Sequence, residues 1–157
     1  MKIRQACLED LDQVTALINA TAKHLIDKDV FQWSYPCEYE EVKREIEQGE
    51  VYLLEDGRKL MGSYSIRPIK DDYQVIIEHG LYLYRIIIHP YFQGNNVGSY
   101  ILNYLRDHHK KKENLILDCW AGNEKLKSFY MRNGCTLLGE FPEESYKICI
   151  FSVDKKH

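Results

Sequence analysis

The sequence predicts a mixed α/β fold in a single domain that spans residues 1–157. The length suits one domain of roughly 100–200 residues. Hydrophobic patterns of helical and of strand type alternate along the chain. The second half contains a strand–helix–strand crossover, which is typical of α/β proteins. The expected order of elements is β-α-α-β-β-β-α-β-α-β-β.

The first half of the chain begins with a strand and two helices and continues as a hairpin. Apolar side chains recur at helical spacing in both helices, and Gly49 is placed to end the second one. Asp56 and Gly57 stand between two apolar runs, which is a strong hairpin signal. The expected elements are a strand at 2–7, helices at 9–25 and 39–48, and strands at 51–55 and 60–66.

The second half is expected to contain the central strand of the sheet. Residues 86–88 are all isoleucine, so this strand is apolar on both faces, as a strand covered on both sides should be. Gly80 precedes the strand and predicts a β-bulge there. The expected elements are a strand at 81–88, a helix starting near 97, a strand at 114–120, a helix at 124–133 and strands at 136–141 and 148–153.

The composition excludes several classes of protein. A net charge of −3 argues against nucleic acid as a partner, because phosphate binding requires a basic excess. No apolar run is long enough for a membrane span or a signal peptide, so we expect a cytoplasmic protein without a membrane partner. Five scattered cysteines indicate buried thiols, and neither a disulfide framework nor a metal site is expected. They are Cys7, Cys37, Cys119, Cys135 and Cys149.

The segment from residue 89 to residue 99 is the most informative for function. Pro90 ends the preceding strand, and the following turn is rich in residues that adopt positive φ angles, namely Gly94, Asn95, Asn96 and Gly98. Such a turn can point successive backbone N–H groups inward, next to the unpaired N–H groups of the following helix. The pattern predicts a pyrophosphate site built from the backbone, although the same residues also form ordinary turns and caps. A P-loop and a dinucleotide-binding glycine motif are both absent from the sequence.

Residues 85–98 resemble the acyl-CoA-binding segment of the GNAT superfamily of N-acetyltransferases. The signature of that family is Gln/Arg-x-x-Gly-x-Gly/Ala after a strand that ends near a proline, and Gln93 and Gly98 match its first and last positions. Asn96 stands where the family has glycine, and asparagine is the next most tolerant residue for a left-handed backbone. A second family pattern, Asn-x-x-small-x-x-aliphatic-Tyr-x-x-x-Gly-Phe, is similar to residues 123–135. It aligns with Asn123, Leu126, Phe129, Tyr130 and Gly134, and Cys135 replaces the final phenylalanine.

The resemblance implies a GNAT-type fold, with a mostly antiparallel sheet of about seven strands flanked by about four helices. It also implies direct acetyl transfer from acetyl-CoA, as the co-substrate, to a primary amine of a small molecule or peptide. No metal is implied, and a homodimer through the final strands is left open. The cofactor-binding residues carried over are Ile86, Ile87, Ile88, Gln93, Gly94, Asn95, Asn96, Val97, Gly98, Ser99, Asn123 and Tyr130.

Further roles follow from the chemistry of the implied reaction. The departing thiolate needs a proton, and the family match assigns this role to Tyr130, although spacing alone favours a core residue at this position. The ammonium group of the acceptor must lose a proton, and Glu78 is the candidate base, or else an ordinary solvated residue at the end of a strand. Trp33 and Tyr35 are candidates for the acceptor pocket or for core packing.

Two other functions remain open on the sequence alone. The same pocket without a productive acceptor site would make a non-catalytic acyl-CoA-binding or sensing domain. A turn of this kind could also serve an α/β protein that binds a different phosphate ligand.

Overall fold

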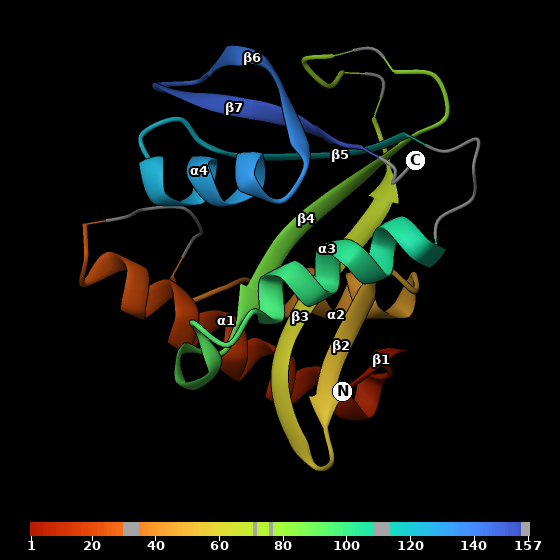
Figure 1. Ribbon diagram of the computed structural model, residues 1–157. Coiled ribbons are helices and arrows are strands. Elements are labelled where there is room, and N and C mark those ends of the chain that lie inside the picture. Colours follow the sequence, from red (N-terminus) through yellow and green to blue (C-terminus); the bar gives the residue numbers. More distant parts are fainter. Residues whose placement is uncertain (30–34, 71, 76, 109–113, 155–157) are drawn as a thin grey trace. The chain divides into compact units, whose positions relative to one another are not determined.

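The computed structural model describes residues 1–29, 35–70, 72–75, 77–108 and 114–154 (Figure 1). Its strands form a seven-stranded sheet in the order β1-β2-β3-β4-β5-β7-β6, in which β4 and β5 run parallel and the other registered pairs run antiparallel. The predicted fold class and order of elements are confirmed. The strands are β1 (Lys2–Gln5), β2 (Val51–Asp56), β3 (Lys59–Pro68), β4 (Gly80–Ile88), β5 (Asn114–Trp120), β6 (Cys135–Glu143) and β7 (Tyr146–Val153). The helices are α1 (Leu11–Ile26), α2 (Tyr39–Glu47), α3 (Val97–His108) and α4 (Glu124–Arg132).

The chain divides into two compact units. The first unit contains Met1–Ser65 and Arg85–Gly98, and the second contains Ile66–Tyr84 and Ser99–His157. The single domain expected over residues 1–157 stays a prediction. Among the described residues, no helix is both long enough and apolar enough to cross a lipid bilayer.

The core of the first unit is formed by one face of each of its helices and by β2. Leu11, Val14 and Ile18 lie on one face of α1 at spacings of three and four residues, and all three are buried. They share a hydrophobic cluster with Val42 and Ile46 of α2 and with buried residues of β2 and β4. β2 pairs with both β1 and β3, so the predicted hairpin is confirmed.

The second unit contains the paired strands β5, β7 and β6, together with α4 (Figure 1). β7 lies between β5 and β6 and pairs with each in antiparallel register. α4 contacts β6, and its N-terminus is capped by the side chain of Asn123, which accepts a hydrogen bond from the amide of Leu126 at 3.1 Å. Ile116, Ile148 and Ile150 form a buried cluster on one face of these strands.

Two expectations from the sequence are wrong. The β-bulge predicted at Gly80 does not appear in the register of β4 with β5, which is regular from Gly80 to Leu83; the missing side chain of Gly80 instead makes room for Ile69. The five cysteines are free, as expected, but Cys7 is exposed, because it stands in the turn that precedes the first helical residues.

A charged network fastens the start of the chain to β2 within the first unit. The guanidinium of Arg4 donates two hydrogen bonds of 2.8 Å to the carboxylate of Asp10 and also contacts Glu55. The amide of Cys7 donates to the same carboxylate at 2.8 Å. Asp10 is buried, and its hydrogen bonds with Arg4 hold its pKa well below its ordinary value.

Replacing Asp10 with asparagine is expected to lower the free energy of unfolding by about 1.5–3 kcal/mol at pH 7, because hydrogen bonds to a charged group are lost. The pKa of Asp10 is lower in the folded than in the unfolded chain. Its carboxylate therefore stabilises the fold above about pH 4, the ordinary range of an aspartate pKa, and less as the pH falls through the folded value.

Chemical denaturation at pH 7 and at about pH 3 measures both effects, and the difference between Asp10→Asn and the wild type should shrink at the lower pH. Glu9→Gln changes an exposed carboxylate in the same turn and is the matched control. Equal stability of Asp10→Asn and the wild type at pH 7 would contradict the role of this network.

Candidate functional site

The turn between β4 and α3 is fixed by local hydrogen bonds in the first unit. The ring of His89 accepts a hydrogen bond from the amide of Tyr91 at 3.1 Å, and a short 3₁₀ helix follows over Pro90–Phe92. The side-chain amide of Gln93 donates to the carbonyl oxygen of Ile88 at 3.3 Å. This bond ties the first residue of the predicted phosphate motif back to the end of the strand.

The backbone of this turn is left-handed at two of the four residues suited to it, whereas Asn95 and Gly98 have no positive φ angle. Gly94 has a φ angle of +88° and Asn96 a φ angle of +60°. A side chain at Gly94 would meet no atom within 4 Å, so this glycine is required by conformation and not by crowding. Asn96 therefore takes over the backbone role of the glycine that it replaces.

Several amides of the turn are left without protein acceptors. Within the part of the chain that the structure describes, neither the amide of Gly94 nor that of Asn96 donates a hydrogen bond, and Asn95 bonds weakly to Phe92 at 3.4 Å. The first turn of α3 adds further unpaired amides at the positive end of the helix dipole. The buried side chain of Val97 anchors the start of this helix. The arrangement is suited to an anion such as a pyrophosphate, which needs N–H donors in a concave backbone.

The backbone conformation of β4, the strand before the turn, changes at one residue. β4 pairs in parallel with β5 from Gly80 to Leu83, and no pairing beyond Leu83 appears in the described residues. Arg85 follows with a φ angle of +49°, which is unusual for a residue that is not glycine. In the described part of the chain, the parallel register with β5 therefore ends before Ile86–Ile88, the predicted thioester-binding residues.

The side chain of Arg85 is fixed within the first unit by an ion pair. Its guanidinium lies 2.8 Å from one carboxylate oxygen of Glu45 on α2 and 3.2 Å from the other, and Glu45 is buried. A bidentate pair of this kind sets the orientation of both groups. The ion pair therefore fastens the left-handed residue of β4 to α2.

The site residues predicted from the second motif lie in the second unit. Asn123 uses its side-chain oxygen to cap α4, and the hydroxyl of Ser99 donates to the side-chain oxygen of Asn133 at 2.8 Å. These bonds position the start of α4 and connect its last turn to Ser99.

Tyr130 is 4% exposed and packs its ring against Phe129 and Phe151. Burial, followed by nearby thiols, raises the pKa of Tyr130 well above its ordinary value, so that its phenol is protonated at neutral pH. Among the described residues its hydroxyl has no hydrogen-bond partner. A protonated hydroxyl of this kind has the form that a proton donor requires.

The remaining predicted residues are not assembled into a pocket by the described contacts. Glu78 lies in the turn before β4, where its side chain is 89% exposed and 3.6 Å from the ring of His79. Tyr35 is 48% exposed. Trp33 lies outside the described residues.

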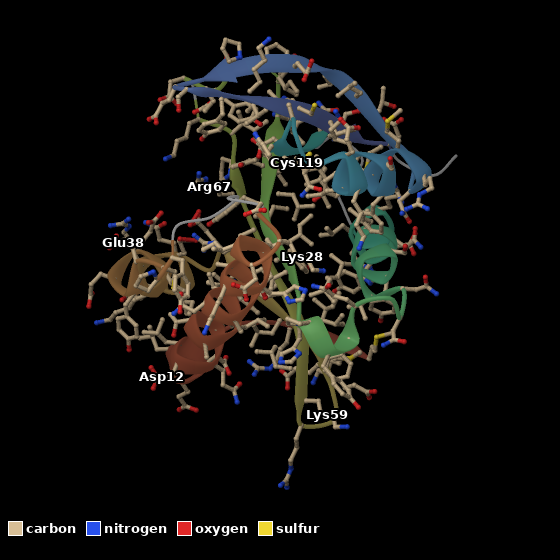
Figure 2. The ribbon with its side chains drawn as sticks, turned by 90° about the vertical axis from the view of Figure 1, so that its left-hand side faces the viewer. Asp12, Lys28, Glu38, Lys59, Arg67 and Cys119 are labelled. Carbon is tan, nitrogen blue, oxygen red and sulfur yellow. The ribbon has the colours of Figure 1, made fainter. Side chains whose placement is uncertain are left out.

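Sequence reasoning missed a group of polar side chains in the second unit. Asp118 stands in the middle of the apolar strand β5 and accepts hydrogen bonds from Tyr73 at 2.6 Å and from Tyr82 at 3.0 Å. The signal was a single charged residue in a buried strand. Figure 2 labels Arg67 of β3 and Cys119, the neighbour of Asp118 in β5. No group of three His, Cys, Asp or Glu residues suited to a metal ion is found among the described residues.

Solved structures of similar fold support the architecture described above. An acetyltransferase of the GNAT family from Streptococcus agalactiae matches with a TM-score of 0.84 at 18% identity, covering 99% of this chain and 96% of its own. A GNAT-family acetyltransferase from Listeria monocytogenes matches with a TM-score of 0.79 at 24% identity, covering 96% and 92%. The structure of yncA from Salmonella typhimurium, solved with its cofactor acetyl-CoA, has a TM-score of 0.75 at 16% identity, covering 100% and 96%.

A curated relative and a family model extend the likeness to the sequence. The uncharacterised N-acetyltransferase YesJ of Bacillus subtilis (strain 168) is 27% identical over 145 residues, which cover 85% of this chain and 81% of YesJ. The model of the acetyltransferase (GNAT) family matches residues 19–135, more than half of the chain. The resemblance found in the two sequence motifs is thereby confirmed. The protein belongs to the acetyltransferase (GNAT) family and is an acetyl-CoA-dependent acetyltransferase.

Proposed function

We propose that the protein transfers the acetyl group of acetyl-CoA to a primary amine of a small molecule or a peptide, by direct attack of the amine on the thioester. One observation carries this proposal: a turn with left-handed residues at Gly94 and Asn96 leaves backbone amides unpaired directly after a strand that has lost its parallel partner. The turn suits a pyrophosphate and the strand suits the arm that follows it.

The proposed contacts to acetyl-CoA come mainly from the backbone. Amides from Gln93 to Ser99 bind the pyrophosphate, with Gly98 leaving space for it at the start of α3. Backbone groups of Ile86–Ile88 bind the pantetheine arm and the carbonyl oxygen of the thioester. Each fixed donor to the developing oxyanion is worth about 2.7–4 kcal/mol of the barrier.

The chemical step needs a base and an acid. The ammonium group of the acceptor loses one proton to the base, and the freed lone pair forms the new bond to the acetyl carbon. As the bond from that carbon to sulfur breaks, the nitrogen loses a second proton, which replaces the one that the acid gives to the thiolate. In this proposal Glu78 takes the proton, through water at its exposed position, and Tyr130 protonates the departing thiolate. The neutral state of the Tyr130 phenol supports the second role.

Replacing Gly98 with leucine is expected to abolish binding of acetyl-CoA, because the added side chain would enter the path of the pyrophosphate. Gly98→Ala should weaken binding by a smaller factor. Isothermal titration measures both affinities, and circular dichroism checks that both variants fold. Unchanged affinity in Gly98→Leu would overturn the proposed phosphate site.

Replacing Tyr130 with phenylalanine is expected to lower kcat by roughly 100-fold, the low end of the usual contribution of a general acid, while the affinity for acetyl-CoA changes little. Steady-state release of the coenzyme A thiol measures kcat. Tyr146→Phe, which changes an exposed tyrosine, is the control and should keep wild-type turnover. Equal turnover in Tyr130→Phe and the wild type would return Tyr130 to a packing role.

Replacing Glu78 with glutamine is expected to lower kcat at neutral pH, because no carboxylate would remain to take the proton from the ammonium group of the substrate. The loss should diminish as the pH approaches the pKa of the acceptor amine, where the free amine is already present. Glu47→Gln at the end of α2 is a matched exposed control. A pH profile of Glu78→Gln that coincides with that of the wild type would exclude Glu78 as the base.

A non-catalytic acyl-CoA sensor is the alternative that the same experiments test. Tight binding of acetyl-CoA without transfer to any amine of a broad panel would favour the sensor over the enzyme.

A further inference from the structure

The group around Asp118 in the second unit has unused capacity for a ligand. Asp118 interrupts the apolar strand β5, and burial raises the pKa of its carboxyl group. Tyr73 donates to one carboxylate oxygen and Tyr82 to the other. Each oxygen has two lone pairs, so both can accept a further donor.

Arg67 supplies the opposite charge in the same unit. The carbon at the centre of its guanidinium lies 4.5 Å from the ring centroid of Tyr84 and 5.5 Å from that of Tyr82. Its Nε atom is buried and has no hydrogen-bond partner among the described residues. In the same part of the chain, no carboxylate oxygen lies within 4.0 Å of a guanidinium nitrogen of Arg67.

An unsatisfied buried donor on a charged group is costly, and native proteins rarely leave one without a reason. The other side chains of the group are satisfied by one another: the two tyrosine hydroxyls reach Asp118, and two rings hold the guanidinium. The Nε donor of Arg67 is the one group of this network for which the described residues supply no acceptor. The described residues thus leave the positive charge of Arg67 without a counter-ion and its Nε without an acceptor.

The two charges are linked by one shared side chain. Tyr82 donates to Asp118 through its hydroxyl and faces Arg67 with its ring. The carboxylate and the guanidinium thus both contact the same tyrosine. Tyr82 and Tyr84 also directly precede Arg85 and the predicted thioester-binding residues in the same strand.

We infer that these side chains form the acceptor subsite, and that the acceptor is an amine that also carries a carboxylate, such as an amino acid or a short peptide with a free C-terminus. Asp118 binds the ammonium group of the acceptor, and the guanidinium of the partly exposed Arg67 binds its carboxylate. The planar guanidinium suits a carboxylate because it can donate two parallel hydrogen bonds. This inference rests on the proposed acetyl transfer and narrows its acceptor.

Matched pairs of acceptors test the role of Arg67. The probes are L-phenylalanine with phenethylamine, and glycyl-L-phenylalanine with its C-terminal amide, each assayed by release of the coenzyme A thiol. The wild type is expected to prefer the member with the carboxylate by at least tenfold in kcat/KM. Arg67→Met should lose this preference by lowering only the values for the carboxylate-bearing members. Arg58→Met, which changes an exposed arginine in the β2–β3 turn, should retain it.

Asp118→Asn tests the other half of the subsite. It should lower kcat/KM about equally for both members of each pair, because the ammonium group is common to them. Tyr73→Phe removes one donor to Asp118 without removing its charge, and should lower kcat/KM less than Asp118→Asn does. Isothermal titration of acetyl-CoA shows whether each variant keeps a folded donor site.

The outcomes separate this inference from the proposed function. Transfer to amines with equal use of both members of each pair, or an equal loss for both members in Arg67→Met, would overturn the carboxylate-bearing acceptor and leave acetyl transfer intact. Absence of transfer to every amine, with acetyl-CoA still bound, would overturn the proposed function and this inference with it.

Discussion

The rest of the proposed site depends on the left-handed backbone conformation of Arg85. Up to Leu83, β4 is an ordinary parallel partner of β5; from Arg85 onward its register with that strand has ended. A left-handed arginine is strained unless its surroundings hold it, and here the surroundings include the buried carboxylate of Glu45 on α2. The proposed site needs such an end of pairing, because an extended ligand adds main-chain hydrogen bonds to an unpaired strand edge.

The turn that follows β4 is also held in place at both of its ends. Gln93 is tied to Ile88, so the turn starts from a fixed strand end, and Val97 is buried, so the helix starts from a fixed point. α1 packs against the short helix Pro90–Phe92 between them. The unpaired amides are therefore held by contacts on both sides of the turn, which lowers the entropy that a bound anion would have to remove.

The sequence predicts the elements of this fold well where the signals are local. The apolar run of β5 predicts the bounds 114–120 that the structure has, and the Asp56-Gly57 turn identifies the β2–β3 hairpin. The left-handed conformation of Asn96 also follows from local composition. The position of the distortion in β4 does not follow from local composition, because the conformation of Arg85 is held by an ion pair with Glu45, which is 40 residues away. Asp118 was missed for the same reason, since its partners Tyr73 and Tyr82 are 45 and 36 residues distant.

The construction of the anion turn from peptide groups has a consequence for how the enzyme would respond to acidity. Peptide N–H groups neither gain nor lose protons in the pH range where proteins are folded. Their affinity for a diphosphate is therefore set by the shape of the turn and by the peptide dipoles. The proposed acceptor subsite contains ionisable groups instead, and burial raises the pKa of Asp118 above its ordinary value. In the proposed site, a change of pH therefore acts on the binding of the acceptor amine and leaves the binding of acetyl-CoA almost constant.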